Sequence, residues 1–148
     1  MRLTTKGRYA VTAVLDLALH QDKGPVSLAA ISERQQISLS YLEQLFAKLR
    51  RNEIVRSTRG PGGGYTLKNS VDDVSVSDII LAVDESCKVV DCGDSGGCHG
   101  EYQCLTHDLW QELSNEIRSF LDGITISEIM SQGTVNDVQL RQDELTIR

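Results

Sequence analysis

The sequence contains no apolar run close to the roughly 20 residues that a membrane-spanning helix needs, which excludes a protein that crosses the membrane as a helix. Its first residues, Met1 to Arg8, lack the apolar segment and cleavage site of a secretory signal peptide. We therefore expect a cytoplasmic protein with no membrane partner. In the reducing cytoplasm, clustered cysteines favour metal or redox chemistry over disulfides.

Signatures of catalysis are also missing. The glycine run Gly62–Gly64 is followed by Tyr65 and Thr66, whereas a phosphate-binding loop needs a lysine and then a serine or threonine after its glycines. No pair of a nucleophile and a neighbouring base stands out. The sequence therefore does not predict an enzyme.

The charge is divided unevenly along the chain. Residues 1–69 hold 11 Lys and Arg against 5 Asp and Glu, a net charge of +6, whereas residues 70–148 hold 4 against 16, a net charge of −12. The basic half could face DNA phosphates while the acidic half faces away. Solvated charge on both halves is the alternative that charge alone leaves open.

Hydrophobic periodicity predicts helices over residues 3–20, 27–35 and 39–52, and Gly24-Pro25 ends the first of them. The third helix has two candidate starts, a cap at Ser38 or a capping box formed by Ser40 and Glu43. Its apolar positions recur at helical spacing and predict a buried stripe: Leu42, Leu45, Phe46 and Leu49. Its other face offers polar and basic side chains: Ser40, Tyr41, Glu43, Gln44, Lys48 and Arg51.

A β-hairpin is predicted directly after these helices. Residues 54–58 and 65–67 have strand character, and Arg59–Gly64 forms the turn between them. Helices followed by a hairpin in this order are typical of a winged helix-turn-helix, with double-stranded DNA as the partner. On the third helix, Gln44 could pair with adenine. At the base of the hairpin, Arg59 could enter a minor groove or contact phosphate.

The second half of the chain predicts further helices. Residues 76–83 form a short one, and residues 105–122 form a long one of about 27 Å. Thr125 can cap another short helix near residue 129, and the chain after residue 132 is expected to be a flexible tail. The long helix carries a broad apolar stripe that needs a partner: Leu109, Trp110, Leu113, Ile117, Phe120 and Leu121.

Three cysteines and a histidine lie in one glycine-rich, acidic stretch, at Cys92, Cys98, Cys104 and His107. These are soft or borderline ligands that can close around a metal centre. Five residues separate each pair of successive cysteines, which is wider than in closed zinc sites and favours an iron–sulfur cluster. Structural zinc and unliganded thiols remain open. On a helix, the side chains of Cys104 and His107 would share one face.

Three other side chains near this stretch have simpler interpretations. Cys87 is expected to be a small buried residue rather than a ligand. His99 directly follows Cys98, and neighbouring residues rarely ligate one centre, so it is expected to be solvated. Trp110 is expected to anchor a core or a dimer interface.

The residues 1–10, 37–44 and 59–65 closely resemble the IscR group of bacterial iron–sulfur cluster regulators, and the resemblance extends to about residue 130. It implies a homodimer with one [2Fe–2S] cluster per subunit, held by the three cysteines and His107. It implies repression of the genes that build such clusters, activation or repression of other genes, and a cluster assembly scaffold as the cluster donor. It also implies DNA-binding residues on the third helix and the wing: Ser38, Ser40, Tyr41, Glu43, Gln44, Arg59, Pro61, Gly62 and Gly63.

The predicted architecture is therefore mainly α with a small β-hairpin wing, a winged helix-turn-helix domain followed by a long dimerisation helix. The expected parts are a DNA-binding domain over residues 1–84 and a cluster-binding loop over 85–107. They continue with a dimerisation helix and a following short helix over 105–131, and a tail over 132–148. The alternative function is a zinc-stabilised DNA-binding or interaction module without cluster sensing. Colour separates the two, because zinc protein is colourless and iron–sulfur protein is brown.

Overall fold

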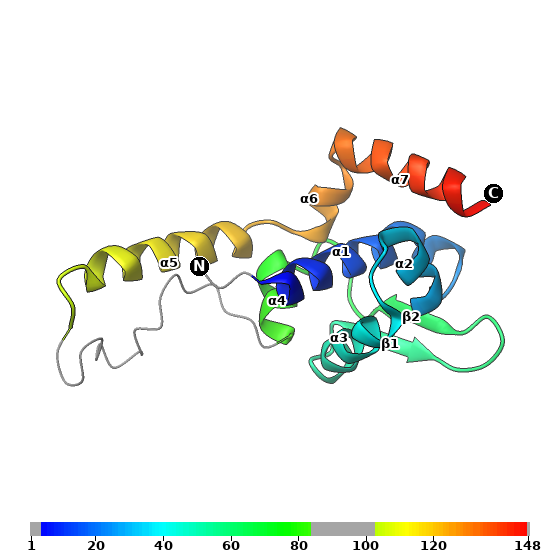
Figure 1. The fold of residues 1–148 in the computed structure, drawn as a ribbon, viewed down its shortest axis with the longest axis horizontal. Helices are drawn as coiled ribbons and strands as arrows, with labels where there is room; N and C mark the ends of the chain where they lie inside the picture. The colour runs from blue at the N-terminus through cyan, green and yellow to red at the C-terminus, as the bar shows by residue number, and fades with distance from the viewer. Residues whose placement is uncertain (1–3, 84–102, 148) are drawn as a thin grey trace.

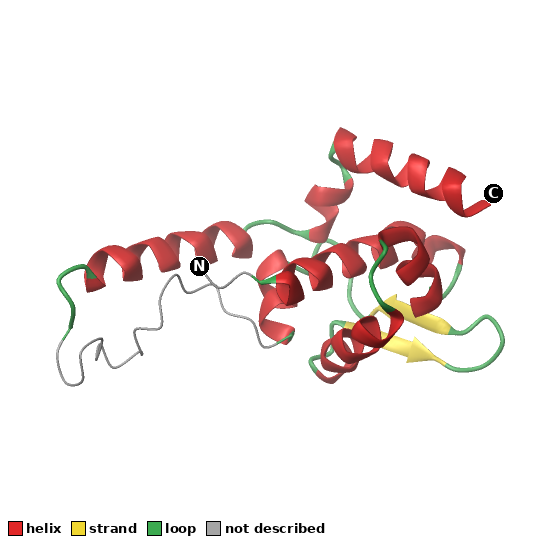
Figure 2. Ribbon diagram, viewed as in Figure 1, coloured by secondary structure: helices red, strands yellow, loops and turns green. Residues whose placement is uncertain are grey.

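The computed structural model describes residues 4–83 and 103–147, which are mostly helical with one antiparallel hairpin (Figures 1 and 2). This confirms the predicted fold class. Cys87, Cys92, Cys98 and His99 lie outside the described residues. In chain order, the elements are α1 (Thr5–His20), the 3-10 helix η1 (Gln21–Lys23), α2 (Leu28–Gln35), α3 (Leu39–Arg51), β1 (Val55–Thr58), β2 (Gly64–Leu67), α4 (Val76–Ala82), α5 (His107–Asp122), α6 (Ile126–Met130) and α7 (Gly133–Ile147).

Helix α1 lies at the centre of residues 4–83, where it contacts α2, α3, α4 and β2. It buries Ala10, Ala13, Val14 and Leu17 completely. Two of these are alanines, so neighbouring helices approach α1 closely. The buried face of α1 therefore has smaller side chains than a face made of large apolar residues.

Serine caps define the starts of α2 and α3. The Ser27 hydroxyl accepts a hydrogen bond from the Ala30 amide, and the Ser38 hydroxyl accepts one from the Tyr41 amide, each at 3.2 Å. The turn between the helices passes through Gln36, whose φ of 56° ends α2 in the left-handed conformation. Of the two predicted starts of α3, the structure has the cap at Ser38. The predicted stripe of α3 is buried, with each member at most 1% exposed: Leu42, Leu45, Phe46 and Leu49.

The hairpin is fastened to the helices beside it. Strands β1 and β2 pair with Val55 opposite Leu67 and Thr58 opposite Gly64. The Tyr65 amide donates to the Val26 carbonyl at 2.7 Å, and the Val26 amide donates back to the Tyr65 carbonyl at 2.9 Å. The segment before α2 thus acts as a short third strand and fixes the hairpin against the helix-turn-helix.

Helix α5 projects away from the other elements, whereas the chain after it returns to them (Figure 1). Near its C-terminal end, Ile117 and Leu121 pack against Val76 and Ile80 of α4. Ile126, at the start of α6, is completely buried in the main core. The expected division between residues 1–84 and 105–131 therefore does not separate two cores, because α6 completes the core of the first part.

Residues 133–147 form helix α7, so the expectation of a flexible tail from residue 132 is wrong for this segment. The segment has no proline and no internal glycine, and it is rich in good helix formers. The sequence does not predict α7 because the apolar periodicity of this segment is weak. The helix packs against α1 and α2 largely through polar side chains. Gln35 of α2 and Gln142 of α7 exchange two amide hydrogen bonds of 2.9 and 3.1 Å.

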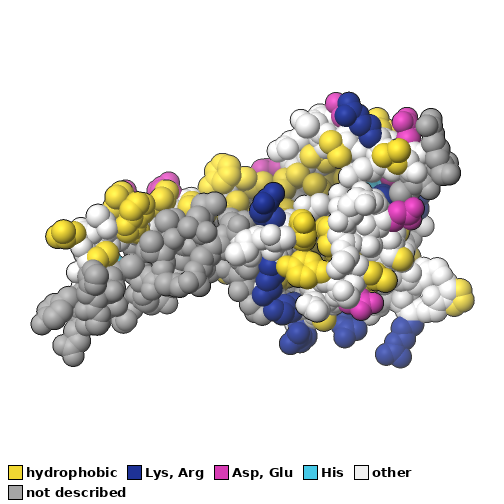
Figure 3. Space-filling model, viewed as in Figure 1, with side chains coloured by type: hydrophobic (Ala, Val, Ile, Leu, Met, Phe, Trp, Pro, Cys, Tyr) yellow, Lys and Arg dark blue, Asp and Glu magenta, His cyan; other side chains and the backbone are white. Residues whose placement is uncertain are grey.

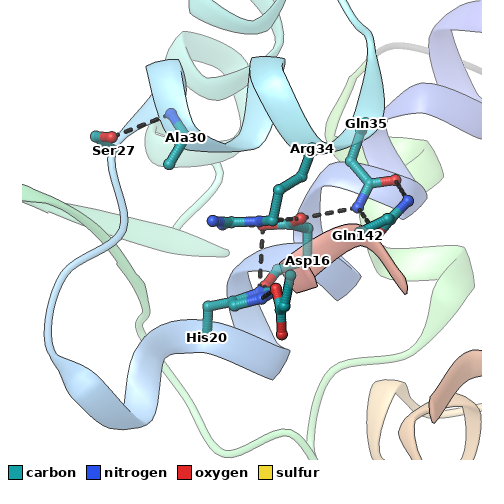
Figure 4. A network of polar contacts seen from close by, with 8 residues as sticks. Asp16, His20, Ser27, Ala30, Arg34, Gln35 and Gln142 are labelled. Carbon is teal, nitrogen blue, oxygen red and sulfur yellow. Dashed lines mark hydrogen bonds and ion pairs between the residues drawn. The ribbon is translucent and has the colours of Figure 1, made fainter. Parts of the chain in front are cut away.

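A network of polar side chains around a buried carboxylate links α1, α2 and α7 (Figure 4). The side chain of Asp16 is fully buried and accepts two hydrogen bonds from the Arg34 guanidinium, at 2.7 and 2.9 Å, and one from Gln35 at 2.8 Å. The hydrogen bond to Asp16 raises the pKa of Arg34, so the guanidinium stays charged. His20 links the same helix to α7 through Asp143, with a ring nitrogen 2.8 Å from the carboxylate.

Replacing Gln142 and Asp143 together by alanine is expected to loosen α7 without disturbing α3. The change removes contacts to Gln35 and His20, and each part-buried hydrogen bond contributes about 1 kcal/mol. Amide exchange in α7 should accelerate by roughly tenfold or more, measured by hydrogen–deuterium exchange and mass spectrometry. Arg141→Ala, on an exposed position of the same helix, is the matched control and should exchange as the unmodified protein does. Equal exchange in both variants would contradict polar docking of α7.

Candidate DNA interface and metal-ligand site

The polar residues predicted to contact DNA lie on the solvent side of α3. Ser38, Ser40, Glu43 and Gln44 are exposed, opposite the buried apolar stripe. The hydroxyl of Ser38 accepts the capping hydrogen bond from the Tyr41 amide at the start of α3. Because Ser40 is not the cap, its hydroxyl and the carboxylate of Glu43 are left for contacts outside the helix. The face thus offers hydroxyl and amide groups suited to base edges and phosphates, and a carboxylate that can accept only from a base amine such as that of cytosine.

Tyr41 is half-buried and is held against α1. Its ring packs edge to face on the ring of Tyr9, with centroids 5.9 Å apart and planes at 83°. Beside it lies a pocket of about 240 Å³ lined by Lys6, Tyr41, Gln44, Leu45 and Lys48. In this pocket, Lys6 from the start of α1 lies next to the exposed polar side of α3. Sequence periodicity pointed to Lys48 but not to Lys6, because only the packing of α1 on α3 brings the two lysines together.

The turn of the hairpin forms a thin, exposed loop. Arg59, Pro61 and Gly62 are exposed and Gly63 is half-buried. Gly60 and Gly62 have φ angles of 100° and 75°, a region that favours glycine. A side chain at Gly63 would collide with the carbonyl oxygens of Thr58 and Gly60. The glycines therefore permit a tight turn that carries no side chain at Gly60, Gly62 or Gly63.

Basic side chains gather along the lower edge of the molecule, over α3 and the hairpin (Figure 3). The exposed members are Arg50 and Arg51 of α3, Arg56 of β1 and Arg59 at the base of the turn. No described acidic side chain forms an ion pair with these four arginines. This edge has the positive charge that phosphate binding requires.

Two of the four predicted metal ligands are described, Cys104 and His107, and both lie at the start of α5. His107 is the first residue of the helix and is buried, at 8% exposure, and its amide donates to the Cys104 carbonyl at 3.2 Å. Cys104 is a partly buried free thiol in the turn before the helix. The condition for both side chains to share one helix face is not met, because Cys104 lies three residues before the first residue of α5. Within residues 4–83 and 103–147, no three metal-binding side chains lie together.

The apolar stripe predicted on the long helix divides into two parts. Ile117 and Leu121 pack within the chain against α4. Leu109, Leu113 and Phe120 remain exposed, at 56%, 41% and 68%. Their spacing of four and seven residues places these three on one side of α5. One side of the projecting helix is therefore an apolar surface with no partner within the described residues of this chain.

Comparison with known proteins identifies the family. The profile of the Rrf2 family, described as an iron-dependent transcriptional regulator, matches residues 3–132. The chain belongs to the Rrf2 family. It is 59% identical to a putative HTH-type transcriptional regulator, ORF2, of Azotobacter vinelandii, over 97% of this chain and 87% of that protein. It is 57% identical to the HTH-type transcriptional regulator IscR of Sodalis glossinidius, over 100% of this chain and 90% of that protein.

Solved structures of the family have the same architecture. The T. potens IscR structure superposes with a TM-score of 0.71 at 37% identity, covering 88% of this chain and 86% of that one. CymR of B. subtilis, described as the global cysteine regulator, superposes with a TM-score of 0.75 at 30% identity, covering 88% of this chain and 97% of that one. The chain is thus a DNA-binding transcriptional regulator with a winged helix and not an enzyme. None of the described helices is long and apolar enough to cross a bilayer.

Proposed function

We propose that this Rrf2 protein senses iron–sulfur cluster status and controls the genes that assemble such clusters. Helix α3 would read operator DNA in the major groove, and the wing would contact the neighbouring minor groove or backbone. The observation that carries the DNA part is the exposed polar face of α3 beside an arginine-rich hairpin. The proposed DNA-binding residues are Ser38, Ser40, Tyr41, Glu43, Gln44, Arg59, Pro61, Gly62 and Gly63.

We further propose that Cys92, Cys98, Cys104 and His107 hold one [2Fe–2S] cluster per subunit. The two described donors fit this group chemically, since thiolate and imidazole are both known cluster ligands, and the two residues lie at or just before the start of α5. Burial of His107 would keep its imidazole in a fixed orientation for ligation. The cluster, when bound, would supply a redox-sensitive centre whose presence depends on the supply of iron and sulfide. A cluster assembly scaffold is the proposed donor.

We propose a physical route from this region to α3 through α4. The segment before Cys104 follows α4, and the Ala82 carbonyl at the end of α4 accepts a hydrogen bond of 3.0 Å from the Asn52 side chain at the end of α3. The other end of the proposed site leads into α5, which packs on α4 as well. A change in order near the ligands could therefore bias the position of α4 and, through it, of α3.

The protein is proposed to act as a twofold homodimer. The exposed apolar side of α5 supplies a surface for a second copy, since a row of large apolar side chains on a projecting helix favours association. A twofold dimer would present two copies of α3 to a near-palindromic operator.

Anaerobic purification tests the proposal most directly. We expect brown protein that contains about two irons and two acid-labile sulfides per chain, and that binds operator fragments of cluster-assembly genes in a gel-shift or anisotropy assay. Stoichiometric zinc without iron would overturn cluster sensing and favour the zinc-stabilised module. Absence of operator binding, with or without a cluster, would overturn the regulatory role.

Arg59→Ala is expected to weaken specific DNA binding by about 1–3 kcal/mol, because the guanidinium lies at the base of the wing and would enter a groove. The iron content should be unchanged. Arg118→Ala, an exposed arginine on α5, is the matched control and should bind operator DNA as the unmodified protein does. Fluorescence anisotropy at one fixed salt concentration measures both variants. If Arg59→Ala binds operator DNA with unchanged affinity, Arg59 of the wing does not contribute to DNA binding.

A further inference from the structure

Thr106 stands in the N-cap position of α5 but does not cap the helix. Its backbone has φ −110° and ψ 15°, and its side chain makes no capping hydrogen bond. The corresponding residues of α2, α3, α4 and α6 all cap their helices with a side-chain oxygen: Ser27, Ser38, Ser75 and Thr125. A capping threonine normally stabilises a helix, by about 1 kcal/mol. At α5 this contribution is absent, so the hydroxyl of Thr106 is engaged elsewhere.

The hydroxyl of Thr106 lies between Trp110 and Cys104. The indole Nε1 of Trp110 donates to Thr106 Oγ1 at 2.9 Å. Because an indole nitrogen can only donate, the threonine oxygen is the acceptor and its own proton remains available. Thr106 Oγ1 also lies 3.9 Å from Cys104 Sγ. Either atom could be the donor in this contact while Cys104 is a thiol, but a Cys104 thiolate can only accept, so the hydroxyl proton of Thr106 would then point toward the sulfur.

We propose that Thr106 is a positioning residue for the metal site, with its hydroxyl oriented by Trp110 to donate a hydrogen bond to the Cys104 thiolate. This inference rests on the proposed function of Cys104 as a cluster ligand. Hydrogen bonds to ligating sulfur withdraw electron density from the metal and raise its reduction potential. Thr106 therefore sets both the orientation of one ligand and the potential at which the bound centre is reduced.

Two substitutions of Thr106 distinguish the effect of its hydroxyl group from the effect of its side-chain volume. Thr106→Val keeps the volume and removes the hydroxyl, whereas Thr106→Ser keeps the hydroxyl and removes the methyl group. In anaerobically purified full-length protein, Thr106→Val should shift the reduction potential to a more negative value. The expected shift corresponds to about a tenfold change in the ratio of reduced to oxidised protein at a given potential, or about 59 mV for one electron. Thr106→Ser should stay close to the unmodified protein.

A second measurement follows the hydrogen bond from Trp110 to Thr106. Trp110 is the only tryptophan of the chain, so a nitrogen-15 spectrum contains one indole N–H resonance. Thr106→Val should move this resonance in the cluster-free protein as well as in the loaded one, and Thr106→Ser should move it much less. This readout does not depend on the bound group.

The outcomes distinguish this inference from the function on which it rests. Unmodified protein that binds no iron would overturn both. Coloured protein whose potential is the same with valine or threonine at position 106 would overturn the inference alone. If Thr106→Val loses the cluster while Thr106→Ser keeps it, the hydroxyl is required and the inference is supported. If both variants lose it, or if the indole resonance is the same in all three proteins, a role for the hydroxyl is refuted.

Discussion

Cys104→Ala is expected to give colourless protein whose iron content falls from about two atoms per chain to nearly none. The substitution removes a thiolate ligand from the proposed set of four, and three remaining donors hold a cluster poorly. His107→Ala should weaken or abolish binding as well, since it removes the one nitrogen ligand. Visible absorption with iron and sulfide assays after anaerobic purification measures the loss.

His99→Ala supplies the matched control for this expectation. It removes an imidazole from the same stretch, but from a position directly after Cys98 that is not expected to ligate. The His99 variant should keep the colour and iron content of the unmodified protein. Iron retained in Cys104→Ala, or lost equally in His99→Ala, would contradict the proposed ligand set.

Leu113→Glu is expected to convert the proposed dimer into a monomer at micromolar concentration. Leu113 lies between Leu109 and Phe120 on the exposed apolar side of α5, and a carboxylate there would be buried without a partner in a dimer interface. Operator affinity should fall by about 10²- to 10⁴-fold, because two half-sites would no longer be bound by one linked unit. Light scattering measures the mass, and anisotropy at fixed salt measures DNA binding.

Gln111→Glu is the control for the dimer experiment. It adds the same charge two residues away, at an exposed position on the opposite side of the helix. This variant should remain a dimer and bind the operator normally. A dimeric Leu113→Glu variant would show that subunits associate through another surface.

The helix-turn-helix and the wing could be predicted from sequence because their signals are local. A stripe at positions 42, 45, 46 and 49, a serine before α3, and a glycine-rich turn between two short strands each depend on neighbouring residues only. The polar face of α3 followed directly from the buried stripe. The candidate DNA-binding residues of α3 could therefore be predicted without tertiary structure, whereas the position of Lys6 beside α3 depends on the packing of α1 on α3.

Helix α1 shows where periodicity was less accurate. The sequence predicts an apolar stripe on this helix, of which two members are buried, Val14 and Ala18, and four are not, Tyr9, Val11, Leu15 and Leu19. The central residues are smaller ones such as Ala10 and Ala13. Helices that pack closely need small side chains at the contact. Alanine contributes little to a hydrophobic pattern, so the pattern does not identify these positions as buried.

The sequence by itself determined the winged-helix architecture, the polar reading face of α3, the basic first half and the four candidate ligands, because all of these are encoded in residue type and spacing. Only the tertiary structure decided that α5 begins at His107, that α7 is a docked helix, and that the Thr106 hydroxyl lies between Trp110 and Cys104. The same physical reason applies to all three observations. Helix starts and polar docking depend on which hydrogen-bond partners meet in space, and residues such as Gln35 and Gln142 meet only when the chain has folded.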